Sequence, residues 1–260
     1  MTLGEAAAHS RVLPDPVVPE WTMGCFRRRS ITFSSGETDT ETRVYWLQSG
    51  RLCADFRFGL PGHVEAGVAH ATWDGSRMRW TEWTALVDRD KWPEAGELRR
   101  VGNSLIEFAP SGAYVEEWRL QPHEPGLLAG LRLIDETDRE TGEIRHRGGG
   151  LLVCGQHIAI VRGGPDFSAA YGVLDPTGAV ARILHYGDAD PGWSLDGFSQ
   201  CEEGLMQSLT VNGRPVRRRY TIDTLLPRFP FPLETPVSES GRGWLQAEAD
   251  TLLVQAKPQH

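Results

Sequence analysis

The sequence lacks the features that mark membrane, secreted and metal-binding proteins. No run approaches the roughly 18 apolar residues that a membrane span needs, and residues 1–20 have no basic start followed by an apolar core. Cysteine is scarce, and no C-x-x-C pair or zinc-ligand spacing with histidine occurs among Cys25, Cys53, Cys154 and Cys201. We therefore expect reduced thiols, no metal, no membrane partner and a cytoplasmic location.

Positive charge is also scarce. The chain has 27 Lys and Arg against 35 Asp and Glu, a net charge of -8 at pH 7. Its basic runs, residues 27–29 and 217–219, are short and far apart, whereas nucleic-acid-binding proteins usually concentrate basic residues in a patch. Residues 148–150 are all glycine but lack the Lys-Ser/Thr of a phosphate loop, and the common hydrolase and metalloprotease motifs are absent. We expect no nucleic-acid partner and no cofactor.

Aromatic residues and chain breakers are abundant. Nine Trp, 29 Gly and 17 Pro favour short strands and turns over long helices. Hairpin turns are predicted at residues 49–50, 74–76, 109–112 and 212–213, and residues 244–255 are read as the last strand. About a dozen short strands near ten residues apart predict an all-β, antiparallel fold of barrel type.

Four segments carry a resemblance to a known family. VYWLQ at residues 44–48, DFR at 55–57, AHATWDG at 69–75 and GLLVCG at 150–155 resemble the calycin, or lipocalin-like, two-barrel family of uncharacterised fungal and bacterial proteins. The resemblance covers roughly residues 21–256. It implies two tandem barrels and brings no catalytic residues. We place a loosely held arm at residues 1–20, a first lipocalin-like barrel at 21–147 and a second at 148–260.

Polar residues that alternate with apolar ones are candidates for the interior of the first barrel. His70, Glu82 and Glu116 each share a face with apolar neighbours, and Tyr114 lies on the face of Glu116. Burial raises the pKa of a carboxyl group toward values useful for proton transfer, so these four residues are the catalytic candidates. The alternative is that each carboxylate pairs with an Arg from a neighbouring strand. Glu107 is assigned to the surface or rim.

A second set of residues is expected to contact a ligand. Trp46, Trp80 and Trp118 would form apolar walls. Arg57, His157 and Arg162 are polar ligand contacts, although a solvated ion pair with Asp55 also accounts for Arg57. The alternative for His157 is a histidine of the core.

The predicted function is the binding of a small, largely apolar or aromatic molecule in a β-barrel pocket. One alternative is an enzyme without metal or nucleotide, an isomerase, lyase or hydrolase that uses acid and base chemistry. Another is a protein-interaction module without a pocket. A homodimer is compatible with each of them.

Overall fold

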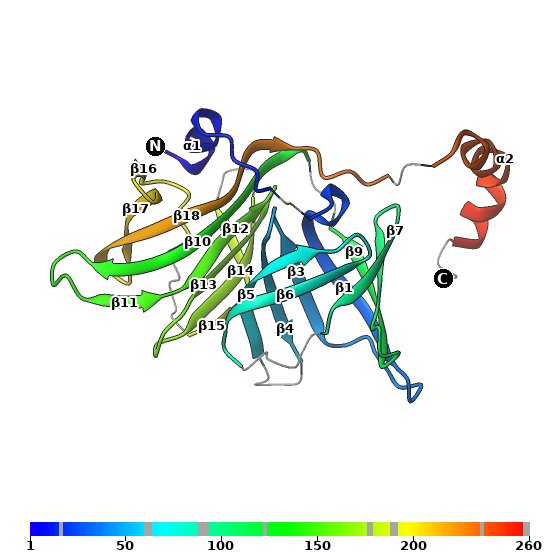
Figure 1. The fold of residues 1–260 in the computed structure, drawn as a ribbon, viewed down its shortest axis with the longest axis horizontal. Coiled ribbons are helices and arrows are strands. Elements are labelled where there is room, and N and C mark those ends of the chain that lie inside the picture. The colour runs from blue at the N-terminus through cyan, green and yellow to red at the C-terminus, as the bar shows by residue number, and fades with distance from the viewer. Residues whose placement is uncertain are drawn as a thin grey trace.

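The computed structural model describes residues 1–15, 18–59, 64–87, 94–121, 124–175, 179–187, 192–234 and 237–256. Two large sheets dominate it, with a helix near each end (Figure 1). The first sheet consists of β1 (Gly24–Phe33), β2 (Thr38–Asp39), β3 (Arg43–Gln48), β4 (Leu52–Phe58), β5 (Val64–Trp73), β6 (Arg77–Ala85), β7 (Gly96–Val101), β8 (Ser104–Phe108) and β9 (Tyr114–Leu120).

The first sheet closes on itself. Its strands follow the order β2-β1-β3-β4-β5-β6-β7-β8-β9, and β1 also pairs with β9. Every pairing is antiparallel, so β1 and β3 to β9 form a closed eight-stranded barrel. The predicted all-β, antiparallel barrel architecture is confirmed.

The second sheet follows a different path. Its strands are β10 (Gly126–Asp138), β11 (Ile144–Arg147), β12 (Gly149–Cys154), β13 (His157–Arg162), β14 (Ser168–Leu174), β15 (Val180–Tyr186), β16 (Phe198–Cys201), β17 (Gly204–Val211) and β18 (Arg214–Phe229). They run from β15 to β16, and no pairing within the described residues joins these two edges. The chain passes between the sheets after Leu120 and before Gly126, which is earlier than the boundary expected at residues 147–148.

Both ends of the chain differ from expectation. Residues expected to form a loose arm contain helix α1 (Leu3–His9), which has a capping box at Thr2 and buries Leu3 on the second module. A short 3-10 helix follows at Glu20–Thr22. The expected last strand is wrong, because residues 244–255 lie in helix α2 (Glu239–Ala256), beside the first barrel in Figure 1. No helix among the described residues is long and apolar enough to cross a membrane.

The two sheets pack against each other through apolar side chains. Tyr45 of β3 stacks on Tyr171 of β14 with ring centroids 4.4 Å apart, and Phe56 of β4 lies 6.2 Å from the same ring. Tyr45 and Phe56 are cross-strand partners, so they lie on the same, outer face of the barrel. Strand β4 is consequently covered on both faces, by the second sheet outside and by the barrel interior inside.

A buried carboxylate fastens the turn between β3 and β4 to the second sheet. Asp223 of β18 accepts hydrogen bonds from the backbone N–H groups of Arg51 and Leu52, at 2.9 and 3.0 Å. Its neighbour Thr224 accepts the N–H of Gly50 at 2.8 Å. A side chain at Gly50 would collide with Thr224, because its Cβ would lie 2.3 Å from the hydroxyl oxygen. The predicted turn at residues 49–50 is therefore also a docking point between the modules.

Candidate functional site

A small cavity lies inside the first barrel. Nine residues of β3, β4, β6, β8 and β9 line it: Trp46, Cys53, Asp55, Arg57, Trp80, Trp83, Glu107, Glu116 and Trp118. Its free space is about 20 Å³. A single water needs roughly 10–15 Å³ on this measure, whereas ligand pockets usually hold about 300–1,000 Å³. The lining side chains therefore occupy nearly all of the lumen.

Three of the lining indoles were predicted from the sequence. Trp46 makes edge contacts with Trp80 and Trp118, with ring centroids 6.1 and 5.7 Å apart. Trp83 of β6 is a fourth indole that the sequence reading missed. Trp80 and Trp83 are half-buried, whereas Trp46 and Trp118 are buried. The two half-buried rings lie where the barrel wall is weakest, because within the described residues only Arg77 and Met78 of β6 pair with β7.

Arg57 points into the lumen and not to solvent. The register of β3 and β4 pairs Trp46 with Asp55, which places Asp55 and Arg57 on the face of the lining indoles. The Nε of Arg57 donates to Oδ1 of Asp55 at 2.9 Å, and the side chains are 12% and 10% exposed. The expected ion pair exists but is largely buried. Burial alone would lower the pKa of Arg57, but Asp55 and Glu116 outweigh this and raise it.

Glu116 and Tyr114 face the interior as predicted. Both are 2% exposed and alternate with outward-facing residues along β9. Nη1 of Arg28, on the adjoining strand β1, donates to Oε1 of Glu116 at 2.7 Å, and Arg28 also bonds to Asp39 at 3.1 Å. Glu116 thus has the Arg partner that the alternative reading expected.

Glu107 is the most informative residue that the sequence reading misplaced. It is 2% exposed, so its assignment to the surface or rim is wrong. It lies directly opposite Glu116 in the β8–β9 ladder. The hydroxyl of Tyr114 donates to its Oε1 and the indole N–H of Trp118 to its Oε2, each at 3.2 Å. Gly96 leaves room for the carboxyl group, since a Cβ there would lie 2.7 Å from Oε1.

The two facing glutamates differ in their partners. Burial raises the pKa of Glu107 to about 8, and the negative charge of Glu116 adds to the effect. Burial also raises the pKa of Glu116, but Arg57 and Arg28 act against it. Because Glu116 has a guanidinium at 2.7 Å and Glu107 has only neutral donors, Glu107 is the member of the pair that holds a proton near pH 7.

His70 and Glu82 do not reach the lumen, which corrects the proposed catalytic group. His70 pairs with Leu52, on the barrel face that packs on the second sheet. Its Nε2 accepts from Nη1 of Arg132 at 2.7 Å, and its Nδ1 lies 3.4 Å from Glu82. Burial and then Arg132 lower the pKa of His70. The backbone of Glu82 has a φ of 55° at a break in the β5–β6 register, and its side chain is 63% exposed.

The other two predicted ligand contacts lie in the second module. Nδ1 of His157 is 2.8 Å from the Tyr171 hydroxyl, and both residues are buried. Arg162 is 1% exposed, with one nitrogen 3.3 Å from Glu136 and another 2.7 Å from the Ser168 hydroxyl. Neither residue lines the lumen cavity.

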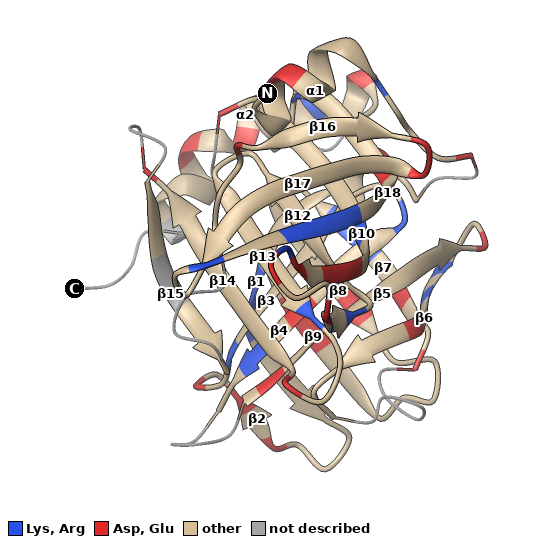
Figure 2. Ribbon diagram, turned by 90° about the vertical axis from the view of Figure 1, so that its left-hand side faces the viewer, with Lys and Arg blue, Asp and Glu red and all other residues tan. Residues whose placement is uncertain are grey.

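Two residues of the basic run at 217–219 have acidic partners. Arg218 is fully buried and donates to Glu136 at 2.6 Å, while Arg219 binds Asp135 and Glu203. Figure 2 shows basic and acidic positions side by side on β18 and β10. The run therefore does not form an unopposed basic patch.

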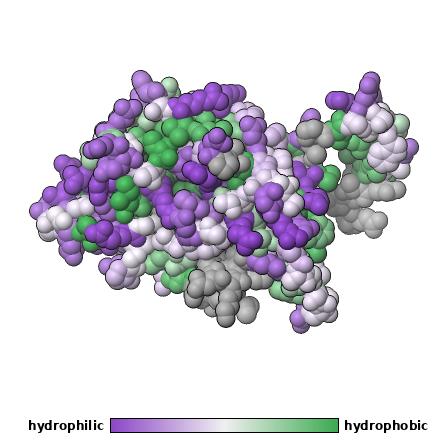
Figure 3. Space-filling view, in the orientation of Figure 1, coloured by the Kyte–Doolittle hydropathy of each residue, from purple (hydrophilic) through white to green (hydrophobic). Residues whose placement is uncertain are grey.

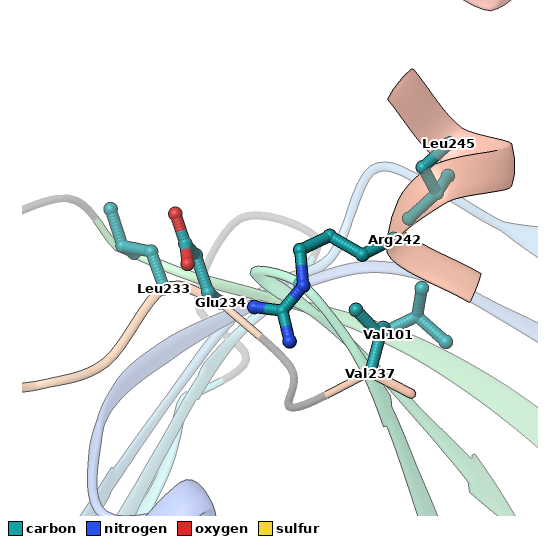
Figure 4. Close-up of a pocket in the computed structure, with 7 residues that line it drawn as sticks. Val101, Leu233, Glu234, Val237, Arg242 and Leu245 are labelled. Atoms are coloured by element: carbon teal, nitrogen blue, oxygen red, sulfur yellow. The ribbon is translucent and has the colours of Figure 1, made fainter. Parts of the chain in front are cut away.

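A larger hollow lies beside α2, outside both sheets. It measures about 720 Å³ and is lined by Val101, Gly102, Leu233, Glu234, Val237, Arg242 and Leu245 (Figure 4). It is an open groove, since Val101 is 73% exposed. The space-filling view shows hydrophobic and hydrophilic residues together on the projecting α2 (Figure 3). Its lining includes one acidic residue, Glu234, and one basic residue, Arg242.

Comparisons with known proteins add little to this geometry. No family model and no curated protein matches the chain. Among solved structures, the chain is similar to the uncharacterised protein YLR301w from Saccharomyces cerevisiae, with a TM-score of 0.48 and 14% sequence identity. The match covers 76% of this chain and 98% of that chain. Within the described residues, no group of three or more His, Cys, Asp or Glu is placed to hold a metal ion.

Proposed function

We propose that the first barrel binds a small molecule with a planar aromatic part in the Trp-lined lumen. The observation that carries the proposal is that four indoles and four ionisable side chains converge on one cavity. Small closed antiparallel barrels of the lipocalin type hold a single ligand in this place. The likeness to calycins noted in the sequence agrees with this use of the barrel.

Ligand entry requires a movement of the barrel wall. The free space of about 20 Å³ accepts no aromatic ring, so the ligand must displace side chains. Trp80 and Trp83 are suited to this, because they are half-buried and lie on the part of β6 beyond its two pairs with β7. Moving them breaks no described β6–β7 ladder hydrogen bond. They would then stack on the ligand.

Intrinsic Trp fluorescence tests the proposal. A panel of small aromatic molecules is titrated into the protein, and members that bind are expected to shift or quench the emission. Trp83→Ala should weaken binding about tenfold or more, because burial of a large apolar side chain contributes about 1.5–3 kcal/mol. Trp244→Ala is the matched control, since Trp244 lies on α2 and is 59% exposed. A panel without any binder, or equal losses in both variants, would contradict the proposal.

Acid and base catalysis in the same lumen is the second candidate, favoured by the opposed Glu107 and Glu116. A neutral carboxyl beside a charged one supplies a proton donor and a proton acceptor, with Tyr114 orienting Glu107. Ligands found by fluorescence would be incubated with the protein and followed by NMR. Glu107→Gln should retain binding and lose turnover. Chemically unchanged ligands, or turnover that survives this substitution, would exclude the candidate for them.

A further inference from the structure

The lumen of the first barrel contains more carboxyl groups than guanidinium groups. Asp55 is paired with Arg57 at 2.9 Å and Glu116 with Arg28 at 2.7 Å. Within the described residues, Glu107 forms no ion pair, and its oxygens accept only from the neutral Tyr114 and Trp118. If all three carboxyl groups were ionised, the lumen would carry one unopposed negative charge.

Four indole rings line the same cavity as this third carboxyl group. Trp118 donates its N–H to Glu107 and also makes an edge contact with Trp46, which in turn contacts Trp80. Trp faces attract cations through their negative quadrupole, and Trp is the strongest of the aromatic residues in this respect. Indoles beside a carboxyl group without a cationic partner form an environment that favours an organic cation over a neutral or anionic molecule.

We propose that the lumen of the first barrel selects a small organic cation of the alkylammonium class, with Glu107 as its counter-ion. This inference rests on the proposed function of the lumen as a binding site. The cation would displace the half-buried Trp80 and Trp83 and lie against Trp46 and Trp118. Arg28 and Arg57 keep their own acidic partners, Glu116 and Asp55, so neither of them forms an ion pair with Glu107.

Binding of the cation is coupled to loss of the Glu107 proton. The groups that face this carboxyl group are Glu116 and Tyr114 on β9, Trp118 on the same strand, and Arg57 on β4. Burial and the charge of Glu116 hold the pKa of Glu107 at about 8, so the carboxyl group is mostly neutral at pH 7. A cation beside it favours the carboxylate and lowers this pKa. The proton then leaves to solvent, and the charge of the site is balanced.

Three probes of similar size separate this inference from the proposed function. They are phenyltrimethylammonium, benzyl alcohol and benzenesulfonate, titrated at pH 7 with Trp emission as the signal. The cation should bind at least about tenfold more tightly than the alcohol. In weakly buffered solution with a pH indicator, its binding should release close to one proton, while the alcohol releases none.

Substitutions test the assignment to Glu107. Glu107→Gln should remove the preference for the cation and abolish proton release. Glu117→Gln is the matched control. Glu117 follows Glu116 on β9, points away from the lumen and pairs with Arg119 at 3.2 Å near the surface. This substitution should leave both properties unchanged. If Glu107→Gln does not fold, proton release by the unaltered protein decides the question alone.

The outcomes are distinct. Equal binding of cation and alcohol, tighter binding of the sulfonate, or cation binding without proton release overturns the inference and leaves the lumen as a binding site. If none of the three probes changes the Trp emission, neither the inference nor the proposed function holds for molecules of this size.

Discussion

The two modules bury a glutamate in opposite surroundings. Glu136 in the second module receives Arg218 at 2.6 Å and Arg162 at 3.3 Å, and these guanidiniums outweigh the effect of burial and lower its pKa. Glu107 in the first barrel receives two neutral donors and faces another carboxyl group, and its pKa is raised to about 8. The second module thus neutralises its buried acid internally. The first leaves one acid that needs either a proton or an external cation.

The largest expected effect tests the second module. Glu136→Gln removes the counter-charge of two buried guanidiniums and should lower the free energy of unfolding by about 3–5 kcal/mol at pH 7. Urea unfolding measures this. Glu143→Gln, at an exposed position on the turn between β10 and β11, should change stability by less than about 0.5 kcal/mol. Similar stability of the two variants would show that Glu136 does not balance the charge of the two buried guanidiniums.

The next effect concerns Glu107 and its pH dependence. Its folded pKa lies above the usual 4.5, so it contributes stability at low pH that is lost as pH rises toward about 8. Glu107→Gln removes this loss. As pH rises from 5 to 8, the free energy of unfolding of the variant should therefore increase by roughly 2–4 kcal/mol relative to that of the unaltered protein. Parallel stability curves for the two proteins across this range would mean that Glu107 is ionised when folded.

The contact between the modules gives a smaller effect. Asp223→Ala leaves the backbone N–H groups of Arg51 and Leu52 without their acceptor. It should lower the free energy of unfolding by about 2–3 kcal/mol. Hydrogen exchange would then show faster opening at the turn between β3 and β4 than at β10. Uniform acceleration in both modules would indicate that they unfold as one unit.

The smallest effect concerns His70. The pKa of His70 is lowered in the folded protein, so the protein loses stability as pH falls below about 6.5. The half-exposed position of His70 limits this effect. His70→Gln should change the free energy of unfolding by less than about 0.5 kcal/mol at pH 7. It should leave ligand binding in the lumen unchanged, as followed by Trp emission. A loss of binding would restore His70 to the site.

The sequence predicted the local features of the fold well. The turns at residues 74–76, 109–112 and 212–213 each join adjacent strands, and Asn212 and Gly213 adopt the positive φ angles that a tight hairpin turn requires. Alternation along β9 placed Tyr114, Glu116 and Trp118 inside. These successes rest on turn chemistry and on period-two burial, which act over a few residues.

The wrong predictions of side-chain direction concern strands of the first barrel that are also covered by the second sheet. Because β4 and β5 are buried on both faces, their apolar residues Phe56 and Val68 face the second sheet while Asp55 faces the lumen. Alternation alone therefore assigned the wrong face to His70 and left a solvated ion pair open as the alternative for Arg57. A usable signal existed for Glu107. A four-residue turn at 109–112 puts Glu107 on the same face as Tyr114, so hairpin parity identifies it as an interior residue.

The proposed role of Glu107 depends most directly on whether its carboxyl group holds a proton. Infrared difference spectra between the unaltered protein and Glu107→Gln, recorded across a pH titration, isolate the C=O absorption of this protonated carboxyl group. This absorption should be present at pH 7 and disappear with a midpoint of about 8. A midpoint at or below the ordinary 4.5 would contradict the proposed role, because Glu107 would then already be a carboxylate in the empty barrel.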